Sequence, residues 1–191
     1  MGRPGVREEI VQAALEQFHA RGFNGTSVED ITSAAGVPKG SFYNHFKSKE
    51  ELAIEVLGRY AAGSPHHILF RQDDGSPIKR LKKYFTTLSD GFIAGGYQKG
   101  CMLGNFANEV ADHSTGVRQE LAARFSLWVE ALAGVIREAQ HAKQITSTQK
   151  PELLAGFLLS AWEGTVLRAR AANDPAIVKE FHTIAFNHLL R

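Results

Sequence analysis

The sequence has very little cysteine: Cys101 is the one cysteine among 191 residues. A single cysteine excludes an internal disulfide and fits a protein of the reducing cytoplasm. No apolar run approaches the roughly 20 residues that a membrane-spanning helix needs. The first residues, M-G-R-P-G-V, lack the apolar stretch of a signal peptide and the serine or threonine of an N-myristoylation motif. We therefore expect a soluble, cytoplasmic protein with no membrane partner.

The chain also lacks a strong net charge. Its 22 basic and 20 acidic residues leave a formal charge of +2, which by itself does not indicate a nucleic-acid partner. The eight histidines show no H-x3-H or H-E-x-x-H spacing, and the adjacent pair His66–His67 lies in a polar, loop-like stretch. We therefore predict no metal site and no cofactor.

No stretch alternates polar and apolar residues as a strand does, whereas apolar residues recur at helical spacing along most of the chain. The pattern predicts an all-α protein of about nine or ten helices. From Ile78, for example, apolar positions form one face and a basic run that includes Arg80 forms the other. The stretch 63–77 is rich in glycine, proline, serine and aspartate, which predicts a linker. It divides the chain into domains of residues 1–62 and 63–191.

Residues 26–49 predict two short helices joined by a tight turn. Thr26 followed three residues later by Glu29 matches a capping box, which begins the first of these helices. Gly36 supplies the positive φ of the turn, and Pro38 suits the first turn of the second helix. Phe42 and Phe46, four residues apart, form its inward face. Such a pair is the minimal device for placing one helix in the major groove of DNA.

The chemistry of the second helix suits DNA. All charged residues between Gly36 and Lys49 are lysines, which neutralise phosphates, and a helix N-terminus also attracts phosphate. The polar side chains that follow are of a size to reach phosphates or base edges: Ser41, Tyr43, Asn44 and His45. A short polar helix with lysine and serine is also a common solvated face, so the pattern alone leaves both readings open.

The string S-V-E-D-I-T-S-A-A-G-V-P-K-G-S-F-Y-N-H-F-K-S-K-E-E-L resembles the signature of TetR-family transcriptional regulators. The resemblance is close over about residues 7–60 and looser beyond them. It implies a helix-turn-helix domain of three helices, followed by a larger helical domain for effector binding and dimerisation. It also implies a ligand-responsive homodimer, a repressor that a small-molecule effector releases from a palindromic double-stranded operator.

The resemblance assigns DNA contacts position by position. Thr26 and Ser27 contact phosphate from the start of the first helix, and Lys49 anchors a phosphate beyond the second. Within the second helix, Lys39, Gly40, Ser41 and Asn44 face the groove, while Tyr43 and His45 contact backbone or bases. Pro38 departs from the family, which often has serine or threonine at this position, so one hydroxyl contact is missing.

Beyond the predicted linker, the segment K-G-C-M-L-G-N-F-A-N-E-V-A-D resembles one branch of the family, which includes redox- and electrophile-responsive repressors with a sensing cysteine. Cys101 lies near a helix start, which favours a thiolate. It is either a reactive sensor or an ordinary small buried side chain. An enzyme that uses Cys101 with His113 lacks a recognisable third residue, so we predict no catalytic residues and no enzyme.

The same half of the chain offers candidate residues for an effector pocket and a dimer interface. Aromatic residues at helical spacing, interrupted by polar ones, either line a pocket or form plain core. The pocket candidates are Cys101, Asn105, Phe106, Glu109, Phe125, Trp128, Trp162 and Glu163. The two penultimate helices form a four-helix bundle in the resembled family, and small residues let helices approach closely. The interface candidates are Phe125, Leu132, Gly156, Ser160, Gly164 and Leu167. A helical interaction module without DNA binding is a further alternative.

Overall fold

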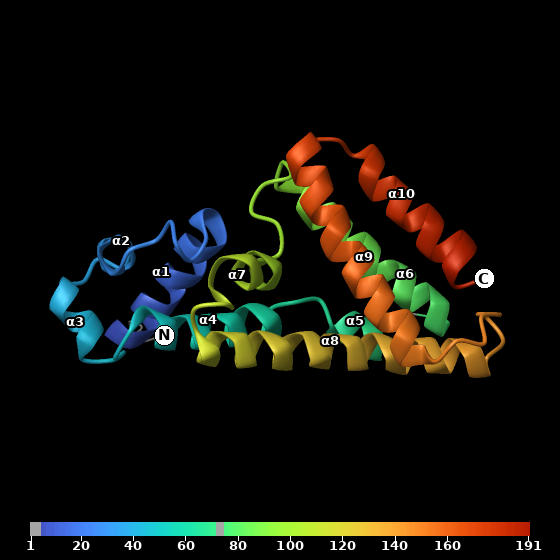
Figure 1. Cartoon of the computed structure of the whole chain (residues 1–191), viewed down its shortest axis with the longest axis horizontal. Helices are drawn as coiled ribbons and strands as arrows, with labels where there is room; N and C mark the ends of the chain where they lie inside the picture. Colours follow the sequence, from blue (N-terminus) through green and yellow to red (C-terminus); the bar gives the residue numbers. More distant parts are fainter. Residues whose placement is uncertain (1–4, 72–74) are drawn as a thin grey trace. The chain divides into compact units, whose positions relative to one another are not determined.

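A computed structural model describes residues 5–71 and 75–191, and every regular element in these ranges is helical. The predicted all-α class is confirmed, with ten α-helices and a final π-helical turn in the described chain (Figure 1). Their bounds are α1 Val6–Arg21, α2 Val28–Ala34, α3 Lys39–Tyr43, α4 Lys49–Ala62, α5 His67–Phe70, α6 Pro77–Ala94, α7 Met102–Val110, α8 Thr115–His141, α9 Pro151–Ala172, α10 Ala176–Ile184 and the turn Ala185–Leu189. Residues 1–4, on which the signal-peptide and myristoylation predictions largely rest, lie outside the described ranges, as do residues 72–74 of the predicted linker.

The chain forms two compact units, which are described separately. The first combines the described residues up to Gly63 with Cys101–Arg124, so it holds α1 to α4, α7 and the beginning of α8. The second combines the described residues of Ser64–Gly100 with Phe125–Arg191. Helix α7, which follows the predicted linker in sequence, therefore clusters with the N-terminal helices.

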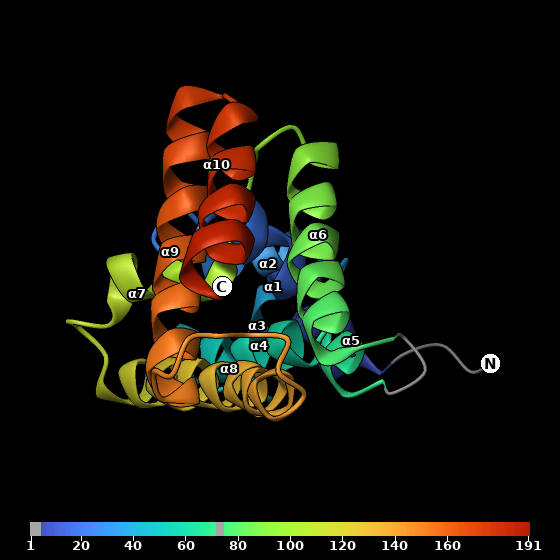
Figure 2. The ribbon, with the colours of Figure 1, turned by 90° about the vertical axis from the view of Figure 1, so that its right-hand side faces the viewer.

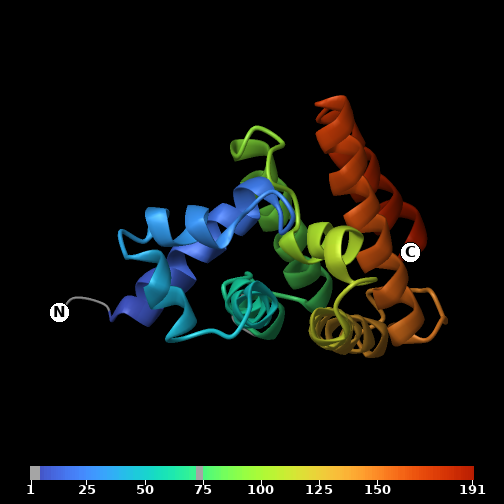
Figure 3. The same cartoon turned by 60° about the vertical axis from the view of Figure 1, so that its left-hand side comes forward.

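In the first unit, α1 is the central helix. It packs against α2, α3 and α4, and its buried stripe includes Ile10, Ala14 and Phe18. Gly22 ends α1 with φ 77°, a left-handed conformation that favours glycine. Figure 3 shows α2 and α3 as the two short light-blue helices that follow α1. Ser48 caps α4 as predicted, because its hydroxyl accepts the backbone N–H of Glu51 at 3.2 Å.

In the second unit, aromatic side chains from α6, α9 and α10 form much of the core. The ring of Phe85 lies 5.9 Å from that of Trp162 and 5.1 Å from that of Phe181. Helices α9 and α10 lie side by side (Figure 2). The final π-helical turn continues α10 and buries Phe186 against Phe85 as well.

Two local predictions about the second unit need correction. The stretch 63–77 is not only a linker, because it contains α5 with Ile68 and Leu69 buried. Arg80, predicted on the basic face of α6, is 3% exposed. Its guanidinium donates to the carbonyl of Leu69 at 3.0 Å and to the carboxylate of Glu138. Burial of this arginine is possible because both terminal nitrogens have partners.

Candidate functional site

Local hydrogen bonds begin α2, and one glycine forms the turn between α2 and α3. Ser27 is the N-cap of α2: its hydroxyl accepts the Asp30 N–H at 3.1 Å, and the Asp30 carboxylate accepts the Ser27 N–H at 2.8 Å. This capping box lies one residue later than predicted. Gly36 follows α2 with φ 68°, and a Cβ there would meet no atom within 4 Å, so backbone conformation alone favours glycine.

Helix α3 is held in place by Phe42 and by Phe46, which follows the helix, and it presents polar residues. Phe42 is fully buried and Phe46 nearly so, with their rings 5.7 Å apart. Pro38 is the N-cap of α3 rather than part of its first turn. The structure brings together on this short segment the predicted side chains Lys39, Gly40, Ser41, Tyr43, Asn44 and His45. All of them are exposed except Ser41, which is half-buried. Tyr43 is 60% exposed.

Lys39 already has an ionic partner on the neighbouring helix. Its ammonium lies 3.1 Å from the carboxylate of Glu29 on α2, and both side chains are more than half exposed. An ion pair in such a solvated position contributes little to stability. The lysine therefore remains available to other anions.

The structure does not place Thr26 where the phosphate contact requires it. Its side chain is 1% exposed, and its hydroxyl donates to the carbonyl of Gly22 at 2.8 Å. The neighbouring Ser27 is exposed, although its hydroxyl also donates to the Asp30 carboxylate at 2.6 Å. Thr26 therefore fastens the loop between α1 and α2, and of the predicted pair only Ser27 faces solvent.

Lys49 is likewise directed inward. Its ammonium donates to the carbonyls of Phe23 at 3.0 Å and Thr26 at 2.9 Å, and it stands 4.1 Å from the centre of the Phe23 ring. Burial lowers the pKa of Lys49, and the carboxylates of Glu50 and Glu109 oppose that shift. These contacts join the start of α4 to the α1–α2 loop, so Lys49 stabilises this loop, and its phosphate contact stays a prediction.

Two of the predicted pocket residues on α7 point into the first unit. Phe106 is fully buried and meets the rings of Phe18 and Phe23 edge-on at 5.4 and 5.6 Å. The Glu109 carboxylate accepts the backbone N–H of Asn24 at 2.9 Å, and the Asn24 side chain donates to the Glu109 carbonyl at 3.3 Å. Both residues therefore hold α7 to the α1–α2 loop, which corrects their assignment to a pocket.

The other pocket candidates are divided between the two units. Cys101 is the N-cap of α7 and 8% exposed, and Asn105 is half-buried on the same helix. In the second unit, Phe125 and Glu163 are half-buried. Trp128 meets His66 at 5.5 Å, whereas Trp162 belongs to the Phe85–Phe181 group. The pocket that these eight residues were predicted to share therefore stays a prediction. The described residues contain no group of three metal-binding side chains.

Sequence reasoning missed His66 and Tyr84 as neighbours of Trp128. The ring of His66 stacks on that of Tyr84 at 5.6 Å and meets Trp128 edge-on. The two come from α6 and from the stretch predicted as a linker, so no spacing in the sequence relates them to α8. The adjacent pair His66–His67 is the one feature of the sequence that draws attention to this position, and its spacing is informative only about metal binding.

An exposed apolar face and a groove run along α9 and α10. The predicted interface residues Ser160 and Leu167 are exposed, and Gly156 and Gly164 are half-buried. Leu132 is fully buried in the core and cannot reach a partner, which corrects that assignment, and Phe125 is half-buried. Other large apolar side chains more than half exposed on this face are Leu153, Phe157 and Ile184.

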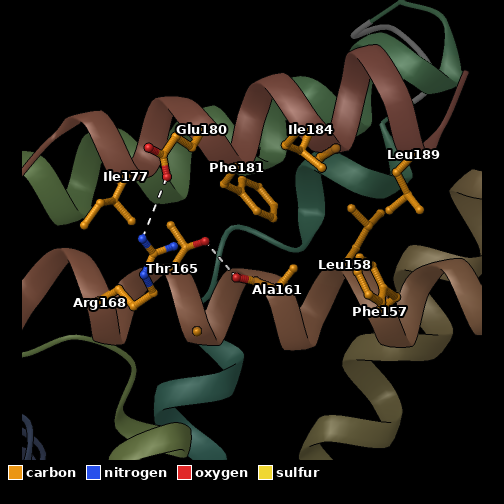
Figure 4. A pocket seen from close by; sticks show the side chains of 12 residues that line it. Phe157, Leu158, Ala161, Thr165, Arg168, Ile177, Glu180, Phe181, Ile184 and Leu189 are labelled. Carbon is orange, nitrogen blue, oxygen red and sulfur yellow. Dashed lines mark hydrogen bonds and ion pairs between the residues drawn. The ribbon is translucent and has the colours of Figure 1, made fainter.

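The groove between α9 and the end of the chain has a volume of about 340 Å3. Figure 4 shows Phe157 and Leu158 on α9 facing Phe181, Ile184 and Leu189 across it. Arg168 and Glu180 form an exposed ion pair of 3.9 Å at one end. The face is thus apolar in its middle and charged at its edge.

None of the helices in the described ranges is long and apolar enough to cross a membrane.

Two family models match the chain. Residues 10–56 match bacterial regulatory proteins of the tetR family, and residues 77–185 match a tetracyclin repressor-like C-terminal domain. The first match covers the helix-turn-helix from α1 into α4. The second runs from α6 into the final turn and so covers most of the second unit.

Individual proteins agree with these models. The HTH-type transcriptional repressor DhaR of Mycobacterium sp. (strain GP1) is 37% identical over 100% of this chain and 95% of its own. The HTH-type transcriptional repressor NemR of Escherichia coli (strain K12) is 26% identical over 88% of this chain and 86% of its own.

Two solved structures share the fold. A regulatory protein TetR from Rhodobacter sphaeroides superimposes with a TM-score of 0.86 at 27% identity and covers 96% of this chain and 98% of its own. The reduced form of E. coli NemR gives 0.87 at 24% identity over 95% of both chains, which is a likeness of fold. The chain therefore belongs to the tetR family of bacterial regulatory proteins, and it acts as a DNA-binding transcriptional regulator that responds to a ligand.

Proposed function

We propose that the chain is a homodimeric repressor that binds a roughly palindromic operator and leaves it when a small effector binds. Residues 1–62 bind the DNA, and residues 63–191 hold the effector and the dimer contacts. DhaR and NemR are both named as transcriptional repressors, which supports repression rather than activation. A cytoplasmic location accompanies this function, because the operator lies there. No enzymatic step is part of the proposal.

The observation that carries the proposal is the exposed polar face of α3. Phe42 and Phe46 are buried in the first unit on the side of α3 opposite its polar residues, so the polar residues can face solvent while the core stays packed. The proposed DNA contacts are Ser27, Lys39, Gly40, Ser41, Tyr43, Asn44 and His45. Thr26 and Lys49 support this face from within rather than touching DNA.

The apolar face of α9 and α10 supports the homodimer. Leu153, Phe157 and Leu167 project from α9 at helical spacing, with Ile184 on α10, and all are more than half exposed. A contiguous face of this kind is typical of a protein interface. A two-fold axis through this face pairs α9 and α10 with their copies as a four-helix bundle. Two α3 helices then read half-sites about 34–36 Å apart.

An effector acts by favouring one arrangement of the dimer over another, and only by the difference between its affinities for the two. Helix α4 joins the domains in sequence. Helix α7 offers a second route, because Glu109 and Phe106 attach it to the loop that precedes α2.

Fluorescence anisotropy with DNA from the protein's own promoter region, at stated salt, tests the proposal. We expect Tyr43→Ala and Asn44→Ala each to weaken binding by about 1–3 kcal/mol, the size of a specific base contact. Gln149→Ala, an exposed position outside the first unit, is the matched control. If both variants bind the DNA as tightly as wild type does, Tyr43 and Asn44 do not contact it. Dimerisation without any operator binding favours the helical interaction module.

A second candidate function is release of DNA by modification of Cys101. The observation that favours it is that Cys101 caps α7 in the same compact unit as the DNA-binding helices. A change at the thiol therefore acts on a helix that Glu109 attaches to the α1–α2 loop. Titration of the protein–DNA complex with N-ethylmaleimide or peroxide tests this candidate. A Cys101→Ser variant that releases DNA like wild type excludes it.

A further inference from the structure

Three rings from separate elements meet inside the second unit. His66 is the N-cap of α5, Tyr84 lies on α6 and Trp128 on α8. The centre of the His66 ring is 5.6 Å from that of Tyr84, nearly parallel to it, and 5.5 Å from that of Trp128, nearly perpendicular. Neither His66 nor Trp128 takes part in the Phe85–Trp162–Phe181 group. We refer to His66, Tyr84 and Trp128 as the three-ring cluster.

The three-ring cluster contains buried polar atoms without a hydrogen-bond partner among the described residues. Trp128 is 6% exposed, and its Nε1–H has no acceptor. The Nε2 atom of His66 is also buried without a partner. An indole nitrogen only donates, so it needs an acceptor from elsewhere. Nearly all buried polar groups in folded proteins have a partner, so an unmet donor of this kind points to a further molecule.

The one arginine that lies a helical turn from the cluster on α6 is already paired with a carboxylate. Arg80, one helical turn before Tyr84 on α6, is bound to Glu138 and to the carbonyl of Leu69, and its buried Nε–H has no acceptor. Burial lowers the pKa of His66, so its imidazole is neutral at pH 7. The cluster therefore offers hydrogen-bond donors and aromatic surface, but no uncompensated charge to attract an acid or an amine.

We propose that the three-ring cluster binds the effector of this regulator, and that the effector is a small uncharged organic molecule with a hydrogen-bond acceptor such as a ketone or aldehyde carbonyl. This inference rests on the proposed function. The carbonyl oxygen accepts the N–H of Trp128, and the carbon skeleton packs on the ring of Tyr84. His66 lies against both rings, so its position changes with occupancy. Carboxylates and amines are excluded because burying either without a counter-ion is costly.

The chain has two tryptophans, which makes the indole N–H of Trp128 directly observable by NMR. Protein labelled with 15N-tryptophan gives two indole signals, and Trp162→Phe assigns them. The probes are acetophenone, cyclohexanone, ethylbenzene, benzoate and benzylamine. We expect acetophenone or cyclohexanone to move the Trp128 proton signal downfield, as a new hydrogen bond does. Ethylbenzene, which has no acceptor, and the two charged probes leave it in place.

Calorimetry provides a second measurement. Trp128→Phe removes the N–H and keeps most of the apolar surface, so we expect it to weaken ketone binding about five- to tenfold, the value of one hydrogen bond. Trp162→Phe is the matched control and leaves the affinity unchanged. Since the NMR titration uses the wild-type chain, the test does not depend on the folding of Trp128→Phe.

The inference is overturned if the Trp128 proton signal does not move when either ketone is added to saturation. This is the result expected if a buried water molecule accepts the indole N–H. It is also overturned if ethylbenzene moves the signal equally, or if Trp128→Phe binds the ketones as wild type does. Operator binding is measured separately by anisotropy. Retained operator binding with an unresponsive Trp128 refutes this site alone. A responsive Trp128 in a protein that binds no operator refutes the regulator and leaves the site standing.

Discussion

Two residues that the resemblance assigns to DNA phosphates, Thr26 and Lys49, are instead bound to the chain itself. Thr26 donates to the carbonyl of Gly22, and Lys49 donates to the carbonyls of Phe23 and Thr26. Together they fix the loop that begins α2. At the residue scale, the proposed DNA-binding face thus depends on one hydroxyl and one ammonium that bind backbone carbonyls of the chain.

Lys49→Met therefore tests stability rather than affinity. The methionine keeps an apolar stem, but it leaves two loop carbonyls without their donor, so we expect the free energy of unfolding to fall by about 1–3 kcal/mol. Urea unfolding measures this loss. Lys47→Met, an exposed neighbour, is the control and should stay within about 0.5 kcal/mol of wild type.

The salt dependence of DNA binding separates the two roles of Lys49. A lost phosphate contact lowers the slope of log affinity against log salt by about 0.9. We expect an unchanged slope for Lys49→Met. If Lys49→Met lowers the slope and leaves the free energy of unfolding unchanged, Lys49 contacts a phosphate.

Several residue assignments could be made from the sequence because they depend on local spacing. Phe42 and Phe46 are buried as their four-residue spacing predicts, and Ser48 caps the next helix. Thr26 and Lys49 could not be assigned, since their partners are backbone carbonyls of a loop whose path no local pattern specifies. The capping box is misplaced by one residue for the same reason: Thr26 and Ser27 both carry a hydroxyl, and tertiary contacts decide which one caps.

At the scale of elements, α7 is the unexpected finding, because it leaves the second half of the sequence to pack with the first unit. Glu109 accepts the Asn24 N–H, and its carboxylate fills the space beside Gly22, where a Cβ would meet it at 2.2 Å. The absence of a side chain at Gly22 thus lets α7 approach α1. Helical periodicity defines a buried face for α7 but does not identify the helix that covers it.

Glu109→Ala tests this attachment. Removal of the carboxylate leaves the Asn24 N–H without its acceptor, so we expect about 1–2 kcal/mol of lost stability in thermal or urea unfolding. If α7 carries the effector signal, the variant also needs more effector to release DNA to the same extent. Asn108→Ala, exposed on the same helix, is the control. Equal stability of the two variants contradicts the role of Glu109.

Helix α10 is joined to α6 by a hydrogen bond whose direction can be inferred. The Ser89 hydroxyl donates to the carbonyl of Phe85 at 2.8 Å, so at its 2.8 Å contact with His182 it accepts the Nε2–H of the imidazole. Burial lowers the pKa of His182; Asp90 opposes this shift and Lys82 adds to it. The folded protein therefore prefers the neutral ring.

The pH dependence of stability follows from this preference. Below about pH 6.5 the unfolded chain binds protons at His182 that the folded chain does not, so the free energy of unfolding falls as the pH drops from 7 to 5. His66, whose pKa burial also lowers, contributes in the same direction. We expect His182→Gln to reduce this fall, as measured by urea unfolding at both pH values. His188→Gln, at an exposed histidine, is the control that keeps the wild-type dependence.

At the scale of the whole molecule, the exposed apolar face on α9 and α10 is the proposed dimer interface. The small-residue spacing on α9 predicted one helix of this face, and Ser160 and Leu167 are exposed as an interface requires. The sequence predicts the helix of about residues 117–142 as the second helix of the interface, and this stays a prediction; Leu132 of that helix is buried, whereas Ile184 of α10 is exposed. An apolar stripe looks the same in sequence whether the chain itself or a second copy covers it.

Leu167→Glu tests the interface. A carboxylate within an apolar contact should raise the dimer dissociation constant by about 30-fold or more, equivalent to roughly 2 kcal/mol. Sedimentation velocity over a concentration series measures the change, and operator affinity should fall with it. Gln149→Glu, the same charge change at an exposed site before α9, should sediment as wild type. Unchanged dimerisation of Leu167→Glu places the interface elsewhere.

The ion pair between Lys39 and Glu29 has a consequence for how the protein searches DNA. Under the proposed function, a phosphate that binds Lys39 replaces an exposed carboxylate 3.1 Å away, so this contact is an exchange of one anion for another. The gain at any single phosphate is correspondingly small, and encounters with unrelated sequence end quickly. Long residence then requires the other α3 contacts to form at the same time. Under the proposed function, we therefore expect Glu29→Gln to strengthen binding to operator and to unrelated DNA alike.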